Sequence, residues 1–128
     1  MENKLSLDTL SFIFKPIYKA IFLAFEKCEQ YFPNNNGKIY LSNLLGFFVN
    51  EKNHDEIKSK CGVVPSLNKR KLFRYLERLN SVNLVKLIEG SRNAIYAYFN
   101  KDLYIEYFKA FNEVSIKERI PSTHKINT

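Results

Sequence analysis

The feature that most constrains the fold is a change of hydrophobic periodicity at Asn83. In the preceding segment, residues 67–81, apolar residues recur at the spacing of an amphipathic helix, namely Leu72, Tyr75, Leu76 and Leu79. After it, two β-rich runs, residues 84–88 and 94–99, flank the polar segment 89–93. Two such runs around a short glycine-containing segment predict a β-hairpin. The sequence therefore predicts a helix that leads directly into a hairpin.

The positive charge of the chain is concentrated on this helix and hairpin. The whole chain has a formal net charge of +7. Residues 66–99 contain seven basic and two acidic side chains, so +5 of that charge lies in this one segment. A local basic surface attracts polyanions by electrostatic steering and by counterion release. Nucleic acid is therefore the leading candidate partner.

Helical periodicity also extends over residues 8–32. Asp8 is a candidate N-cap, but Pro16 is unfavourable inside a helix, so we expect the continuous helix to begin at Lys15 or Pro16. The segment 33–37, a proline followed by three asparagines and a glycine, ends it. Because this helix is apolar on more than one face, it is either deeply buried or in contact with a second subunit.

Short elements are predicted between the two helices. Residues 38–41 have strand character, and Ser42 is a candidate cap for a helix that ends at Val49. Another helix is expected over 53–61, with Asn53 or Asp55 near its start, and Gly62 ends it. Ser66 then offers a side-chain oxygen to the first turn of the basic helix.

One more helix is predicted at residues 102–118, with Asn100 or Asp102 as its cap and a broad apolar face. The tail after Pro121 is expected to fray. A chain of 128 residues has the size of one domain, so we expect residues 1–128 to form a single unit. The fold class expected from these patterns is mainly α with a small β-hairpin.

The order of short helix, glycine-containing turn, basic helix and hairpin resembles the winged helix-turn-helix superfamily, and in particular small archaeal, plasmid, viral and bacterial regulators. The resemblance covers residues 55–99 and is carried by Ile57, Cys61, Gly62, Val63, Ser66, Leu72, Tyr75, Leu76, Leu79, Leu84, Val85 and the hairpin. It implies a winged helix-turn-helix with extra N- and C-terminal helices. Residues 42–52 are longer than this segment is in the shortest members, and Val64-Pro65 makes the turn unusual. An alternative register makes 42–49 the second helix of the motif.

The resemblance implies a recognition helix that enters the major groove, which is about 12 Å wide. Asn68, Arg70 and Arg74 are candidates for reading base edges, because arginine pairs bidentately with guanine and asparagine with adenine. The other candidate DNA-binding residues are Lys69, Lys71 and Arg78 on the helix, Ser66 in the turn before it, and Lys86, Arg92 and Asn93 on the hairpin.

No catalytic residue, metal or cofactor is expected. Cys28 and Cys61 lack metal-ligand spacing and are interpreted as small buried hydrophobes. His54 and His124 have no evident partner residues. Signatures of a nucleophile elbow or a phosphate loop are missing from the sequence, so it predicts no enzyme activity.

The sequence gives no indication of two other partners, single-stranded nucleic acid and a membrane. No run of the sequence looks like a sheet-borne aromatic platform for single-stranded nucleic acid, so Phe73 and the tyrosines are expected to pack in the core. Apolar runs stay shorter than the roughly 18 residues of a membrane span, and residues 1–11 lack a secretory signal pattern. We therefore expect a cytoplasmic protein without membrane contact.

The expected function is sequence-specific binding of double-stranded DNA by a dimeric transcriptional regulator. The homodimer is expected to form through 8–32 and 102–118, because these segments have more apolar surface than the motif covers. Two alternatives remain open. One is a plasmid or viral replication or partition protein that binds DNA, and the other is a winged-helix module whose basic helix contacts an acidic protein.

Overall fold

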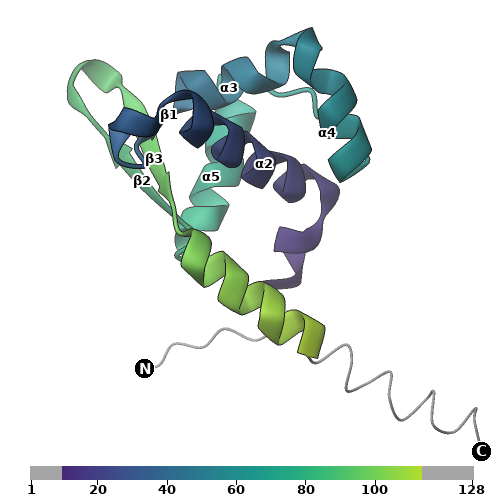
Figure 1. Cartoon of the computed structure of the whole chain (residues 1–128). Coiled ribbons are helices and arrows are strands. Elements are labelled where there is room, and N and C mark those ends of the chain that lie inside the picture. The colour runs from purple at the N-terminus through teal and green to yellow at the C-terminus, as the bar shows by residue number, and fades with distance from the viewer. Residues whose placement is uncertain (1–9, 114–128) are drawn as a thin grey trace, which may run out of the picture.

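The computed structural model describes residues 10–113. Within that range the chain is mainly helical and has a three-stranded antiparallel sheet (Figure 1). The helices are α2 (Pro16–Tyr31), α3 (Leu41–Val49), α4 (His54–Cys61), α5 (Lys69–Ser81) and a last one over 101–113. The strands are β1 (Ile39–Tyr40), β2 (Val85–Glu89) and β3 (Ile95–Phe99), and the short 3-10 turns are η1 (Ser11–Phe14), η2 (Pro33–Asn35), η3 (Glu51–Asn53) and η4 (Ser91–Asn93).

The start of α2 confirms the prediction from its proline. Pro16 occupies the first helical position, where its missing N–H costs no hydrogen bond, and Lys15 precedes it with an extended backbone. The candidate cap Asp8 lies outside the described residues. Gly62 ends α4 as predicted, with a left-handed φ of +86° that is accessible to glycine.

The basic helix α5 begins at Lys69, two residues later than predicted. The cap is Asn68, whose Oδ1 accepts a hydrogen bond from the Lys71 backbone N–H at 2.8 Å. The prediction that Ser66 caps this helix is therefore wrong. Residues 66–68 precede the helix, so the Ser66 side chain lies too far back to meet the orphan N–H groups of the first turn.

The hairpin prediction is confirmed, and its second strand has another neighbour. The strands β2 and β3 pair antiparallel, and β1 pairs with the other edge of β3, which gives the order β1-β3-β2. The first strand is shorter than predicted because Leu41 already begins α3. At the hairpin tip, Arg92 and Asn93 have left-handed φ values of +59° and +62°, a conformation that is uncommon outside glycine.

Helix α2 lies at the centre of the fold. Its residues Ile21, Ala24 and Phe25 are fully buried, and Phe25 stacks on Phe99 of β3 with ring centroids 5.4 Å apart. Nearly all of the apolar surface of α2 is therefore covered within one copy of the chain. Of the two sequence-based alternatives for this helix, the structure supports deep burial.

Both short helices pack against α2, but only one of them also packs extensively against α5. Helix α4 lies against α2, where Lys27 Nζ is 2.9 Å from Glu56 Oε2, whereas α3 packs against both α2 and α5. The side chain of Asn53 does not cap α4 and instead donates to the Phe47 carbonyl at 3.0 Å. The helix that packs most extensively against the basic helix is thus residues 41–49, and not the predicted segment 55–61.

The last helix is capped by Asn100, whose Oδ1 accepts from the Leu103 N–H at 3.1 Å. This confirms one of the two predicted caps. In Figure 1 the helix crosses the end of the domain below α2. Two of its apolar side chains, Ile105 and Phe108, remain 39% and 43% accessible. The predicted residues 114–118 lie outside the described part of the chain.

The prediction that Phe73 and the tyrosines pack in the core is wrong for Phe73, for the exposed Tyr31 and for the tyrosines of the sheet. Tyr18 is buried, but Tyr40, Tyr96 and Tyr98 are only half-buried and lie outside the core cluster. Alternation along β3 turns Ala97 inward, where it is fully buried, and turns its two tyrosine neighbours to the outer face of the sheet.

Candidate nucleic-acid interface

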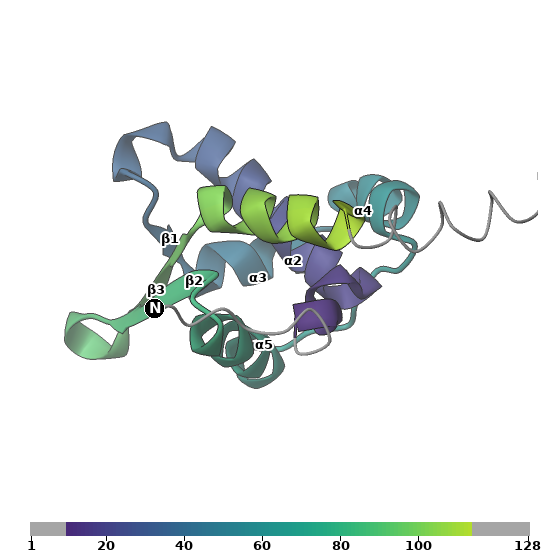
Figure 2. The ribbon, with the colours of Figure 1, turned by 90° about the horizontal axis from the view of Figure 1, so that it is seen from below.

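All ten candidate DNA-binding residues are exposed, and most of them lie on or next to α5. Leu72, Leu76 and Leu79 are fully buried and define the inner side of this helix. Arg70 and Arg74 are one helical turn apart on the opposite side. In Figure 2, α5 lies along one edge of the molecule, so its basic side is accessible to a large partner.

A basic groove runs beside α5. It has a volume of about 660 Å³ and lies between α5, the connection before it and the start of α2. Its polar lining comes from Lys71, Arg74 and Arg78 on α5, together with Ser66. The structure thus brings together four residues that the sequence predicted separately. Positively charged side chains around an open groove suit an anionic backbone.

Arg78 has a second set of contacts that the sequence did not predict. Its guanidinium carbon lies 4.5 Å from the centroid of the Phe12 ring in η1. Burial raises the pKa of the nearby Tyr18 hydroxyl, and the charge of Arg78 and its hydrogen bond to this hydroxyl act in the opposite direction. Tyr18 also packs edge to face with Tyr75 of α5. Arg78 therefore helps to hold the N-terminal turn against α5.

The structure also changes the interpretation of Asn68. A bidentate pair with adenine requires both the oxygen and the amino group of the amide. The Asn68 oxygen already accepts the capping hydrogen bond from Lys71. The cap fixes the orientation of this amide against the first turn of α5, so adenine would have to pair with an amide whose direction the helix already sets.

The hairpin residues Lys86, Arg92 and Asn93 lie apart from the groove. Lys86 is exposed on β2, and the other two form the tip, which projects beyond the helices (Figures 1 and 2). The base of the hairpin is fixed to α5, because the Leu87 N–H donates to Asn80 Oδ1 at 3.2 Å. The strand part of the hairpin is thus attached to α5, whereas the basic groups of the tip and of the helix are separate.

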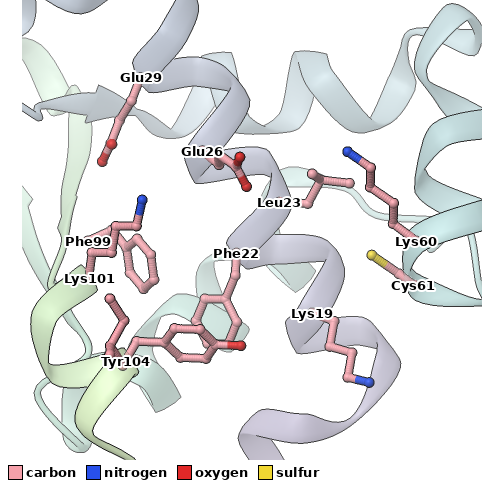
Figure 3. Close-up of a pocket in the computed structure, with 11 residues that line it drawn as sticks. Lys19, Phe22, Leu23, Glu26, Glu29, Lys60, Cys61, Phe99, Lys101 and Tyr104 are labelled. Carbon is pink, nitrogen blue, oxygen red and sulfur yellow. The ribbon is translucent and has the colours of Figure 1, made fainter. Parts of the chain in front are cut away.

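A smaller cavity lies on another side of the molecule. It encloses about 260 Å³ between α2, the end of α4 and the start of the 101–113 helix (Figure 3). Phe22 and Tyr104 form part of its apolar floor, and Glu29 and Lys60 are among the charged groups at its rim. Burial raises the pKa of Glu29 and also that of the Cys61 thiol. At neutral pH this thiol is mostly protonated, which makes it a poor nucleophile.

The cysteines and histidines named in the sequence analysis form no candidate site in the described residues. Cys28 and Cys61 are buried free thiols, as predicted. His54 Nε2 is hydrogen-bonded to the Phe48 carbonyl at 2.8 Å, and His124 lies outside the described residues.

Within residues 10–113, no group of three His, Cys, Asp or Glu side chains is placed to hold a metal ion. None of the helices in this part of the chain has the length and apolar character needed to span a bilayer.

Comparison with known proteins identifies no relative. No protein-family model matches the chain, and neither a curated protein nor a solved structure is significantly similar to it.

Proposed function

We propose that this protein binds double-stranded DNA sequence-specifically, with α5 in the major groove, as a dimeric transcriptional regulator. The proposal assigns it no chemistry of its own. The order α2, β1, α3, α5, β2, β3 and the sheet order β1-β3-β2 are similar to those of winged helix-turn-helix domains. In this interpretation α3 and α5 form the helix pair, because they pack together, and α4 is an insertion between them.

The observation that carries the proposal is the charge at the start of α5. Its first turn contains Lys69, Arg70 and Lys71 and no acidic residue. The N-terminal end of a helix has a partial positive charge, so cations there are unfavourable and anions are favourable. Three basic residues at this end oppose the usual electrostatics of a helix. A phosphate backbone would relieve the repulsion, which explains why such a sequence suits a DNA-binding helix.

The candidate residues then have distinct roles. Arg70 and Arg74 read bases, since each guanidinium donates two hydrogen bonds to one guanine. Phosphates are held by Lys69, Lys71, Arg78 and Lys86. Of these, Lys71 and Arg78 line the groove together with Ser66. Arg92 and Asn93 contact the adjacent minor groove or the backbone. The left-handed backbone of Arg92 is a local strain of the kind found at functional positions.

The dimer part of the proposal now rests on the last helix alone. The apolar residues of α2 are buried within one copy, so the segment 8–32 needs no partner subunit to cover it. Ile105 and Phe108 are exposed on 101–113 and provide apolar area for a second copy. Two copies would place their α5 helices about 34 Å apart, which is one turn of DNA. Light scattering that finds a monomer at all concentrations would remove this part.

The DNA interface is tested by charge reversal. The double variant Arg70→Glu/Arg74→Glu should lose most of its duplex affinity. Its dependence on salt should become shallower, by about 0.9 in logarithmic slope for each phosphate that the variant no longer neutralises. The matched control is Lys52→Glu/Lys58→Glu, which alters the net charge equally at two exposed sites away from α5. It should bind nearly as tightly as the parent protein.

The other candidate functions correspond to other outcomes. Equal affinity and equal salt slope for the two double variants would reject this interface. A lack of duplex affinity for the parent protein even at low salt would favour the alternative, in which the α5 surface contacts an acidic protein. Selection of bound sites from randomised DNA would separate a regulator from a plasmid or viral replication or partition protein.

A further inference from the structure

The outer face of the sheet is a second surface with the chemistry of nucleic-acid binding, and it is separate from α5. We define the tyrosine face as Tyr40, Tyr96 and Tyr98 with Lys38 and Lys86. The strand register places these groups together. Tyr40 lies directly across from Tyr96, and Lys86 lies across from Tyr98. Residues in register on neighbouring strands point to the same side of a sheet.

The rings of this face form one connected group. The centroids of Tyr40 and Tyr96 are 5.8 Å apart, and those of Tyr96 and Tyr98 are 6.0 Å apart, both with edge-to-face geometry. Lys38 Nζ lies 4.7 Å from the Tyr96 centroid and 5.7 Å from that of Tyr40. The alignment of three rings and a cation is thus already present in the free protein.

Glycine at position 90 makes room for the Tyr96 ring, whereas Gly37 lies only at ordinary contact distance from Tyr98. A Cβ atom on Gly90 would lie 3.0 Å from Cε1 of Tyr96, and a Cβ on Gly37 would lie 3.8 Å from Cδ1 of Tyr98. The Tyr96 ring therefore lies against the backbone of the hairpin tip. A larger residue at position 90 would displace it. The backbone at Gly90 thus orients the Tyr96 ring, and the hydrophobic core does not cover this ring.

Core packing does not account for the tyrosine face. Tyr40, Tyr96 and Tyr98 are neither among the buried residues nor among the half-buried ones that pack against the core. Aromatic pairs across strands do stabilise sheets, but this role needs no cations. Within the strands, the outward neighbours of these tyrosines are Lys86 and Ile88, with no carboxylate, and Lys38 adds a second cation at the edge.

We propose that the tyrosine face binds single-stranded nucleic acid. Unpaired bases stack on accessible aromatic rings, and lysines beside the rings hold the phosphates, which is the general mode of single-strand recognition on sheets. The contact between Lys38 and the Tyr96 ring is weak because both residues are still partly accessible to solvent. An incoming base displaces the ammonium group, which then lies next to the backbone phosphate. Stacking tolerates any base, so this face has little sequence preference.

This inference adds to the proposed function and does not depend on it. Duplex binding uses mainly α5, whereas single-strand binding uses the tyrosines of β1 and β3. Lys86 on β2 borders both surfaces, so the tyrosine variants and the Arg70/Arg74 variant are the ones that separate the two proposals. A protein with both surfaces would hold a junction between duplex and single strand, which is the substrate chemistry of a replication or partition protein more than that of a simple repressor.

The test measures the anisotropy of a labelled oligothymidylate and a labelled oligouridylate of about 12 nucleotides, a length within the usual range of single-strand sites. We expect Tyr96→Ala and Tyr98→Ala each to weaken binding by about 5- to 140-fold, the loss of one stacked base. Tyr96→Phe keeps the ring and should bind like the parent protein. Tyr31→Ala, which removes a 62% exposed tyrosine on α2, is the matched control and should also bind normally.

Three further measurements separate a loss of binding from a loss of fold. The variant Lys38→Glu/Lys86→Glu keeps every ring and should weaken single-strand binding with a shallower salt dependence. The chain contains 8 tyrosines and no tryptophan, so quenching of tyrosine emission by the oligonucleotide reports stacking directly. Circular dichroism identifies any variant that has lost its fold.

The outcomes are distinct. Binding of both oligonucleotides indicates recognition by stacking and phosphates alone, and preference for one of them identifies DNA or RNA as the ligand. Arg70→Glu/Arg74→Glu should lose duplex binding and retain single-strand binding, so the two proposals fail independently. The inference is overturned if the parent protein binds neither oligonucleotide at low salt, or if Tyr31→Ala weakens binding as much as Tyr96→Ala.

Discussion

Replacement of Asn68 by alanine tests whether this residue caps α5 or reads a base. The Asn68 oxygen accepts from the Lys71 N–H at 2.8 Å, and alanine removes this acceptor. Loss of such a cap typically costs about 1 kcal/mol. The unfolding entropy is about 2.1 cal/mol/K per residue, so for 128 residues this cost lowers Tm by about 4 °C.

The matched variant is Asn68→Ser. Serine caps helices about as well as asparagine, so its Tm should stay within about 1 °C of the parent value. Serine cannot form a bidentate pair with adenine. If Asn68 only caps the helix, the base preference of Asn68→Ser in a selection from randomised duplexes should equal that of the parent protein.

The assay combines thermal unfolding followed by circular dichroism with that binding selection. A parent-like Tm for Asn68→Ala would show that the hydrogen bond to Lys71 contributes nothing to stability. A loss of preference for adenine at one site position in Asn68→Ser would refute the argument that the cap occupies the amide.

Four other predictions follow from single contacts. Phe25→Ala should cost about 3 to 5 kcal/mol in urea denaturation, because the ring is fully buried. Arg78→Ala should lower Tm by a few degrees, because a partly exposed cation-ring contact such as that with Phe12 contributes about 0.5 to 1 kcal/mol. Burial raises the pKa of Cys28 from 9.0 to about 11, so alkylation at pH 8 should be about 100-fold slower than in the unfolded chain. Hydrogen bonds from Lys60 and Lys27 lower the pKa of Glu56, so its stabilising effect is present above its unfolded pKa and is lost as the pH falls through the folded value.

For each of these four predictions, one measured outcome would contradict the reasoning. A cost below about 1 kcal/mol for Phe25→Ala would mean that α2 is not central. An Arg78→Ala variant with unchanged Tm and weaker DNA binding would make this arginine a phosphate contact only. Rapid alkylation of Cys28 in the folded protein would show that the thiol is accessible. For Glu56, the difference in Tm between the parent and Glu56→Gln should shrink on acidification, and a constant difference would exclude the ion pairs as its source.

Much of the fold was predictable because local patterns report local structure. The 67–81 periodicity places Leu72, Leu76 and Leu79 on one side of a helix, and they are buried there. Pro16 and Gly62 mark helix boundaries through their own backbone geometry. The basic residues of α5 are exposed for the same reason, since the side opposite a buried stripe faces solvent.

The arrangement of these elements was not predictable from local pattern. The packing of α3 against α5, in place of α4, follows from which apolar faces meet in three dimensions. Arg78 reaches Phe12 only because η1 folds back along α5. No spacing rule links residues so far apart in the sequence, because such a contact depends on the whole path of the chain.

The basic helix and hairpin are the part of this protein that its sequence determined, since the periodicities of 3.6 and 2 and the charge pattern are written in consecutive residues. The tyrosine face was decided by tertiary structure alone. Tyr96 and Tyr98 alternate with the buried Ala97 on β3, but their third ring comes from Tyr40, which is brought alongside by the pairing of β1 with β3. Strand pairing joins distant segments through backbone hydrogen bonds that any sequence can form, so the neighbours of a side chain on a sheet are known only once the strand order is known.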